Sequence, residues 1–505
     1  MIHVPAKRAD EDESASLNRR FDVVVIGAGF GGLGAALRFA ERGADVLLLE
    51  ARSYPGGCAS TFIHDGARFE SGATLFSGLA SGELFGKWIE RYGLGVEIDW
   101  IDPLVEFRSP ELSLPIGRQR GAFVDSLAAH PSAPRNALVR FFHYQKRVAD
   151  VMWGLLDDPR LLPPFGVAAL ASHVRHLPRT ACALRDIGKP LSKVLERFGL
   201  ADFAPLRVLL DALCQITVQC EAREAEAPVA LAAIDYFWRG TGHVRGGIGQ
   251  LASGLVEGLR AAGGKVHFST RAKRIERAHN GWRIHTRRGI ASAIHVAANL
   301  LPQDLDALLD SDVPRSQRLP RLAAQTETGW GACMLYLQLE PNDAPAQHLQ
   351  LVMDSTRPML EGNHVFCSIS GTRDGERAPK GRSTATVSAH VPMSRWRALN
   401  NADRGAYAAE VQDRMRATLA ARAPEIDARI VKSFTASPRT FERFTARREG
   451  LVGGVPRRAG LGQYFQLRNP PVADRLYLVG DSAFPGQSTL ATALGGWKVA
   501  ERHRF

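Results

Sequence analysis

The sequence has few cysteines and no long apolar run, and both absences restrict what the protein can be. Its 505 residues include six cysteines, with no C-x-x-C pair and no cysteine–histidine cluster at zinc-site spacing. A disulfide scaffold is therefore excluded, and we expect no bound metal. No run of about 18 apolar residues is free of charged or turn residues, so no membrane-spanning helix is predicted. We expect a protein of the reducing, cytoplasmic compartment.

Lysine is also scarce, because only ten of the 64 basic residues are lysine. This composition is typical of a GC-rich bacterial genome, and we expect a role in bacterial biosynthesis. Basic residues outnumber the 52 acidic residues, and residues 135–197 alone contain eleven basic and five acidic residues. Such a surface attracts anionic lipid headgroups or nucleic acid. Because no nucleic-acid-binding motif accompanies the charge, we expect no nucleic acid partner.

The length of the chain predicts more than one domain, since single cores rarely exceed about 250 to 300 residues. Residues 1–20 are charged and predict a mobile tail. The pair Arg19 and Arg20 before an apolar run is similar to a twin-arginine export signal. However, the run is short and leads directly into a glycine-rich turn, so a strand explains it better and we expect no export.

A glycine fingerprint follows this run. Asp22 to Ile26 predicts a strand buried on both faces, Leu33 to Arg42 predicts a helix, and Ala44 to Leu49 predicts a second strand. The turn between them fits G-x-G-x-x-G, in which the glycines allow a tight turn and a close approach of backbone N–H groups to a pyrophosphate. The acid that ends the second strand is placed to bind a ribose diol. The candidate dinucleotide-binding residues are Gly27, Gly29, Phe30, Gly31, Gly32 and Glu50.

The loop after Glu50 contains a Gly-Gly pair six residues later. This spacing resembles the extended FAD-binding motif shared by amine oxidases, phytoene desaturases, carotenoid isomerases and retinol saturases. The resemblance implies that the loop passes the flavin diphosphate toward the ring. No second G-x-G-x-x-G follows a strand elsewhere, so FAD is the single dinucleotide that we expect. The resemblance adds Ala51, Arg52, Gly56, Gly57 and Cys58 to the candidate site.

A second motif lies near the C-terminus, where the strand Arg475 to Val479 leads into the sequence GDSAFPGQS and a helix from Thr489 to Arg502. A carboxylate just after a strand can bind the ribityl or diphosphate end of FAD. The N-terminus of the helix can direct N–H groups at the flavin C2 carbonyl and stabilise negative charge on the reduced ring. The candidate residues are Gly480, Asp481, Gln487, Ser488 and Thr489.

The sequence LYLVGDSAFPGQ is very similar to the C-terminal motif of carotenoid isomerases. The middle stretch His243 to Leu259 is similar to the helix that follows a Gly-Gly pair in that family, and Ala272 takes the position of its backbone contact with adenine. The resemblance covers residues 21–80, 240–305 and 445–505. The chain departs from it at Cys58, where amine oxidases and phytoene desaturases usually have arginine, and after Gln487, where a glycine often follows.

We therefore expect an α/β fold, with a Rossmann-type FAD-binding domain assembled from the three discontinuous segments. Residues 81–239 and 306–444 would form a substrate domain of mixed sheet and helices. Within it, residues 130–235 predict helices that form either a domain core or a surface facing lipid or membrane. Strand-like alternation in Gly331 to Glu340 and in Ser383 to Val391 predicts a sheet facing the flavin.

The expected function is an FAD-dependent oxidoreductase acting on carbon–carbon bonds, by desaturation, isomerisation or saturation. The resemblance implies a lipophilic, polyene-like or polyketide-like substrate, and a peripheral membrane contact would agree with it. A flavin amine oxidase, a flavin monooxygenase and a non-enzymatic lipid-binding escort protein are the alternatives.

No residue pattern identifies a catalytic base or the electron acceptor. We expect His64 and Asp65 at an exposed hairpin turn and Cys58 as a buried small apolar residue. His243 and Arg245 would either line the site or face solvent.

Overall fold

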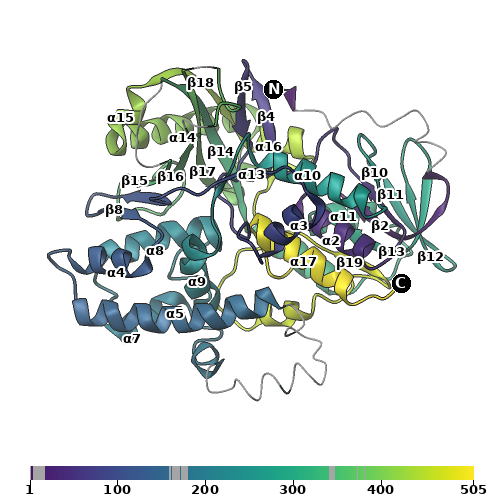
Figure 1. Cartoon of the computed structure of the whole chain (residues 1–505), viewed down its shortest axis with the longest axis horizontal. Helices are drawn as coiled ribbons and strands as arrows, with labels where there is room; N and C mark the ends of the chain where they lie inside the picture. The colour runs from purple at the N-terminus through teal and green to yellow at the C-terminus, as the bar shows by residue number, and fades with distance from the viewer. Residues whose placement is uncertain are drawn as a thin grey trace.

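The structure is a computed structural model that describes residues 2–3, 17–158, 161, 171, 180–340, 347–371, 374–379 and 381–505. Two large sheets lie in separate parts of the molecule, and a group of helices lies below one of them in the view of Figure 1. The first sheet holds both the N-terminal and the C-terminal glycine-rich segments.

The first sheet is assembled from three distant parts of the chain. Its core is parallel: β2 pairs with β3 and β13, β10 extends β3, and β19 pairs with the end of β13. Its strands, in spatial order, are β10 (Lys265–His267), β3 (Val46–Leu49), β2 (Arg20–Ile26), β13 (Ile290–Ala298), β12 (Gly281–His285) and β11 (Arg274–Ala278), with β19 (Leu476–Leu478) beside β13. This arrangement confirms the predicted Rossmann-type domain built from discontinuous segments.

Helices cover both faces of this sheet, which explains why β2 reads as a continuous apolar run. Val23 and Val25 pack on one face with the helices α2 (Phe30–Glu41), α3 (Leu84–Tyr92), α10 (Ile248–Ala261) and α17 (Thr489–Glu501). Val24 and Ile26 pack on the other face with α11 (Pro302–Leu308) and α12 (Arg318–Glu327). Residues of α3 and α12, which lie outside the segments predicted for the FAD-binding domain, thus pack against the first sheet.

The second sheet is mostly antiparallel and contains the two strands predicted to face the flavin. Its order is β18 (Ile430–Ala436), β14 (Trp330–Leu339), β17 (Ser383–Pro392), β16 (His364–Ile369), β15 (His348–Val352), β7 (Val105–Arg108) and β8 (Ser113–Ile116). Helix α14 (Asn401–Arg422) packs on one face through apolar residues of both elements. The other face contacts the hairpin of β4 (Thr61–His64) and β5 (Ala67–Glu70), where Tyr336 meets Phe62 and Phe69.

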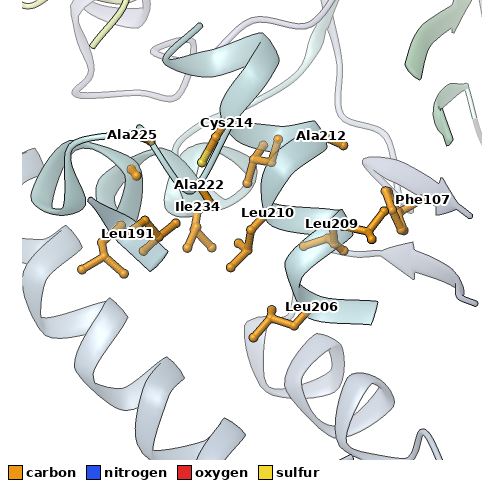
Figure 2. Packing of buried hydrophobic residues seen from close by; sticks show 14 of the residues in the cluster. Phe107, Leu191, Leu206, Leu209, Leu210, Ala212, Cys214, Ala222, Ala225 and Ile234 are labelled. Carbon is orange, nitrogen blue, oxygen red and sulfur yellow. The ribbon is translucent and has the colours of Figure 1, made fainter. Parts of the chain in front are cut away.

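The predicted helical region forms its own apolar core. The helices are α4 (Arg120–Ala128), α5 (Arg135–Asp157), α7 (Leu191–Phe198), α8 (Ala204–Thr217) and α9 (Ala227–Ile234). Figure 2 shows Leu206, Leu209 and Leu210 of α8 within this core, with Ile234 of α9 and Leu191 of α7 nearby. Most of the apolar surface of α8 is thus covered by protein.

Short elements connect these parts. They are β1 (Ile2–His3), β6 (Ile98–Asp99), β9 (His243–Val244), α13 (Met393–Ala398), α15 (Pro424–Asp427), α16 (Pro438–Thr445) and the 3₁₀ helices η2 (Asp235–Trp238), η3 (Arg448–Gly450) and η4 (Gly462–Arg468). None of the described helices has both the length and the apolar character that a membrane span requires.

The described residues at both ends of the predicted N-terminal tail contact other parts of the chain. Strand β1 pairs with β4, Leu17 is fully buried, and Arg19 forms an ion pair of 2.6 Å with Asp45. Strand β2 already begins at Arg20. Residues 1 and 4–16 lie outside the described part of the chain, so the prediction of a mobile tail stays a prediction for them.

Truncation of Leu210 tests the helical core. Leu210 is fully buried, and we expect Leu210→Ala to lower the free energy of unfolding by about 2 to 5 kcal/mol, since deleting a buried side chain leaves a cavity. Val139→Ala on α5 is the control, because Val139 is 44% exposed and its loss should change stability by less than about 0.5 kcal/mol. Equal effects in urea denaturation would contradict the assigned core.

Candidate functional site

A cavity of about 990 Å³ adjoins the fingerprint turn, the Gly-Gly loop and the C-terminal motif, and it continues between the second sheet and the helical region. Gly32 and Gly480, which were also predicted as site residues, do not line this cavity. The predicted site residues that do line it are Gly27, Gly29, Phe30, Gly31, Glu50, Ala51, Arg52, Gly56, Gly57, Cys58, Ala272, Asp481, Gln487, Ser488 and Thr489.

The fingerprint glycines have different structural reasons to lack a side chain. Gly27 has a φ of +94°, which side chains strongly disfavour, and its N–H donates to the Leu49 carbonyl at 2.7 Å. A Cβ at Gly32 would lie 1.9 Å from the Gly27 carbonyl oxygen. Gly32 therefore lets α2 pack against the turn, and it acts on the site through this packing.

Helix α2 directs its N-terminus into the cavity. It begins at Phe30, earlier than the predicted Leu33, because Leu33 already donates to the Gly29 carbonyl at 2.9 Å. No side chain caps the helix, and its first turn contains no acidic residue. The N–H groups of this turn thus provide an unopposed positive end, which suits a phosphate.

Glu50 lies at the end of β3 with its carboxylate held by backbone N–H groups. One oxygen accepts from Ala28 at 2.7 Å and the other accepts from Arg52 at 2.7 Å. Burial raises the pKa of Glu50, while these hydrogen bonds act in the opposite direction. The side chain is fixed in orientation and borders the cavity, as an acceptor for a ribose diol should be.

The loop between β10 and β11 lies beside Glu50. Its backbone is tied to the Glu50 peptide, because Glu50 N–H donates to His267 at 2.9 Å and Thr270 N–H donates to Glu50 at 2.8 Å. Ala272 lines the cavity two residues before β11 begins. Its own N–H and carbonyl bond to no other backbone group of the described residues. Both groups therefore stay available for the edge of an adenine base.

The Gly-Gly loop runs alongside the fingerprint turn. Gly56 donates its N–H to the Ala28 carbonyl at 2.8 Å and forms a parallel bridge with Gly29. Gly56 and Gly57 have φ values of +105° and +61°, so both positions favour glycine. Cys58 follows on the cavity wall, and burial raises the pKa of its thiol. A neutral thiol agrees with the predicted role of a small apolar residue rather than a reactive thiolate.

The C-terminal motif meets the other two segments across this cavity. Asp481 forms an ion pair of 2.8 Å with Arg447. Ser488, with a φ of +96°, caps α17 by accepting from the Ala491 N–H at 3.0 Å, and Thr489 begins the helix. The Gln487 amide donates to the Ile216 carbonyl of α8, so it ties the motif to the helical region.

Three lining residues were not predicted from the sequence. Arg457 is 5% exposed, forms no ion pair within the described part of the chain, and leaves its Nε without a hydrogen-bond partner there. Burial lowers the pKa of Arg457 to about 10. Arg447 provides a second, half-buried cation, and Asn299 places its amide between Gly29 and Gly480. In an arginine-rich sequence no local signal distinguishes these two arginines from the others.

These features fit FAD. The Nε atoms of Arg52 and Arg457 are buried and without a partner among the described residues, and both side chains line the cavity. Together with the α2 N-terminus they offer positive charge to a diphosphate, while Glu50 offers an acceptor to a ribose. The residues that would hold FAD thus come from all three predicted segments.

The remaining candidate residues lie outside the cavity. His64 and Asp65 border the turn between β4 and β5, where Asp65 is exposed and pairs with Lys432 at 3.2 Å. Their prediction as a hairpin turn is confirmed. His243 neither lines the cavity nor faces solvent, since it is buried with its Nε2 3.5 Å from Asp374. Arg245 lies at the surface and forms an ion pair of 2.8 Å with Asp99.

Comparison with known families agrees with this geometry. The profile of the family described as flavin containing amine oxidoreductase matches residues 30–502. The chain belongs to this family. The match confirms the resemblance drawn from the sequence motifs, and it confirms an FAD-dependent oxidoreductase. The predicted escort protein without enzymatic activity is therefore not the better interpretation.

Relatives and solved structures extend the comparison. Chloroplastic prolycopene isomerase of Daucus carota is 25% identical over 525 residues, which cover 98% of this chain and 82% of that protein. All-trans-retinol 13,14-reductase of Homo sapiens is 27% identical over 252 residues, covering 49% of this chain and 41% of that protein. An oxidoreductase from Methanosarcina mazei has a TM-score of 0.64 at 17% identity and covers 96% of this chain and 100% of its own. Putrescine oxidase bound to putrescine has a TM-score of 0.63 at 16% identity, with coverages of 96% of this chain and 99% of its own. The two structures show the shared fold.

A side chain at Gly29 should prevent FAD binding. A Cβ there would lie 2.6 Å from the Asn299 amide nitrogen, and the valine of Gly29→Val would also occupy the space through which a phosphate reaches the α2 N-terminus. We expect FAD affinity to fall at least about tenfold, or about 1.4 kcal/mol, in titrations of the apoprotein. Gly121→Ala is the control, because no atom lies within 4 Å of its Cβ position. Full flavin occupancy in Gly29→Val would refute the assigned phosphate site.

Removal of the Asp481 charge should weaken FAD binding without unfolding the protein. Asp481→Asn keeps the shape of the side chain but leaves the half-buried Arg447 without its anionic partner, so the local charge that positions the cofactor changes. We expect an FAD dissociation constant about tenfold higher, with thermal unfolding of the apoprotein nearly unchanged. Asp474→Asn is the matched control, since its side chain is 57% exposed. An unchanged dissociation constant would remove Asp481 from the site.

Proposed function

We propose that the protein is an FAD-dependent oxidoreductase that acts on carbon–carbon bonds of a lipophilic, polyene-like or polyketide-like substrate, by desaturation, isomerisation or saturation. The observation that carries this proposal is the apolar continuation of the cavity beyond the cofactor residues. Its walls there come from α5, α8, α9 and η2, and they include Val151, Met152, Leu155, Leu156, Leu213, Ile216, Val229, Ala233 and Phe237.

The charges around the cavity disfavour an amine substrate. The acidic residues among the described lining are Glu50, Asp304 and Asp481. Glu50 is held by backbone N–H groups, Asp481 pairs with Arg447, and Asp304 lies 3.4 Å from Arg448. No acidic residue from the helical region lines the cavity, so a substrate ammonium group would be buried there without a counter-ion. No lysine occurs in the described lining either.

Bound FAD supplies the hydride or electron transfer that carbon–carbon bond chemistry requires. The chain's own residues bind the cofactor and orient the substrate. Arg52 and Arg457 offer charge to the diphosphate end, Glu50 fixes the ribose end, and the apolar walls exclude water from the reacting bond. The reaction class is supported by the names of the relatives, which act on prolycopene and retinol.

The border of the cavity supports a peripheral membrane contact as the route of substrate entry. Leu184 lines the cavity and is 54% exposed, while Leu461 is 61% exposed and lies against Gly188. Arg185 and Lys189 are exposed on the same turn of chain. Exposed leucines beside basic side chains suit the surface of an anionic bilayer.

Substrate trials with a narrowed cavity test the proposal. FAD-loaded protein, oxidised or reduced, is incubated without oxygen with prolycopene, with retinol and with putrescine, and the products are separated by chromatography. We expect the protein to desaturate, isomerise or saturate a polyene and not to react with putrescine. Ala233→Phe should lower polyene conversion at least about tenfold while FAD content stays the same, because the added ring fills the apolar part of the cavity.

Ala409→Phe is the control for this variant, since Ala409 is exposed on α14 and far from the lining. Reduction of the flavin by putrescine without any polyene conversion would overturn the proposal in favour of an amine oxidase.

A further inference from the structure

The face of the second sheet that borders the cavity carries polar residues in an otherwise apolar wall. Strand register places Met334 of β14, Ser388 of β17, Phe366 of β16 and Gln350 of β15 in one continuous cross-strand row. Directly opposed residues point to the same face of a sheet, and all four line the cavity. His390, two residues from Ser388 on β17, also lines it.

We propose that Gln350, Ser388 and His390 form a hydrogen-bonding subsite for an uncharged oxygen, a hydroxyl or a carbonyl, carried by the lipophilic substrate. The inference rests on the proposed function, because it specifies the substrate of the same cavity. It divides the cavity into an apolar part along the helices and a polar part against the sheet.

Gln350 is the strongest indication of a ligand. Its side chain is 2% exposed, and its amide makes no hydrogen bond with any residue that the structure describes. A buried amide nitrogen without a partner is energetically unfavourable, so such groups are rarely left unpaired in proteins. The cavity provides the space in which a ligand can approach this amide.

His390 and Ser388 complete the subsite. The imidazole of His390 has no hydrogen-bond partner in the described part of the chain, and Ser388 makes a long contact of 3.5 Å to the Phe366 carbonyl. Burial lowers the pKa of His390 to about 4, so the ring is neutral at pH 7 and offers one donor and one acceptor. All three side chains can therefore exchange hydrogen bonds with an oxygen.

The absence of charge on this wall defines the class of ligand. The residues from β14 to β17 that line the cavity are Ala332, Met334, Gln350, Phe366, Ser388 and His390, and none of them carries a formal charge at pH 7. A carboxylate or an ammonium group would be buried here without a counter-ion, whereas a hydroxyl or carbonyl would not. A pure hydrocarbon would leave the Gln350 amide unpaired.

Two neighbouring polar residues on the same sheet lack one of the two properties that a ligand-binding group needs, a free hydrogen-bonding atom and access to the cavity. Tyr336 uses its hydroxyl on the Ser71 carbonyl at 2.7 Å, so it is already occupied within the protein. The ring nitrogens of His348 have no partner among the described residues, but His348 does not line the cavity. Gln350 and His390 combine both properties, since they are unpartnered and the cavity reaches them.

A matched pair of ligands tests the subsite by binding rather than by turnover. The probes are all-trans-retinol and the hydrocarbon with a methyl group in place of its CH₂OH. Their dissociation constants for the FAD-loaded protein are measured by quenching of tryptophan fluorescence, because Trp153 lines the cavity. We expect the alcohol to bind at least about tenfold more tightly than the hydrocarbon, the ratio that one satisfied hydrogen bond to a buried polar group provides.

Two variants test whether residues of the second sheet cause the tighter binding of the alcohol. Gln350→Met keeps the unbranched shape and removes the amide, and we expect it to reduce the ratio to about threefold or less without weakening hydrocarbon binding. His390→Leu is the second variant and should reduce the ratio as well. Gln338→Met is the control, since Gln338 is 3% exposed on the same face but lies outside the cavity lining.

Equal binding of the two probes by the unmodified protein, or a ratio that stays unchanged in both variants, would overturn the subsite. Binding of neither probe would overturn it too. Flavin content and polyene conversion are recorded on the same samples. Loss of the proposed function would appear there as an inability to convert any polyene, whatever the ratio of the two dissociation constants.

Discussion

The close approach of helix α2 to the turn after β2 is the contact on which the site depends. A Cβ at Gly32 would lie 1.9 Å from the Gly27 carbonyl, and a Cβ at Gly31 would lie 2.7 Å from Gly480. On the other side, a Cβ at Gly496 of α17 would lie 2.1 Å from the Gly31 carbonyl. Because no side chain separates them, α2 and α17 bring the two ends of the chain together. The fingerprint turn and the C-terminal motif consequently border one cavity.

Charge is distributed unevenly along this cavity. At the cofactor end, buried arginines and an uncapped helix N-terminus leave positive charge that a diphosphate can neutralise. Toward the helical region the described lining has no formal charge, and the second sheet contributes neutral hydrogen-bonding groups. The lining of one continuous cavity is thus charged at the cofactor end and apolar toward the helical region.

Local pattern accounted for the elements with the strongest periodicity. The strand from Asp22, the helix after it and the second strand of the fingerprint were all expected, with ends that differ by a few residues. The region 130–235, predicted to be helical, contains α5, α7 and α8. Strands β7 and β8 were not predicted, because each spans only four residues. The packing of α12 on the first sheet was not predicted, since it depends on contacts distant in sequence.

The sequence by itself determined the cofactor, the family and the residues of the fingerprint, since tight turns and close helix packing demand glycine at short, regular spacing. It also indicated Glu50 and Asp481, because Glu50 directly follows β3 and Asp481 lies three residues beyond β19 in the same sheet. Only the tertiary structure revealed Arg457 as a buried cation and Gln350, Ser388 and His390 as one polar wall. Their roles depend on strand register and burial, which arise from contacts between segments far apart in the chain and leave no local pattern.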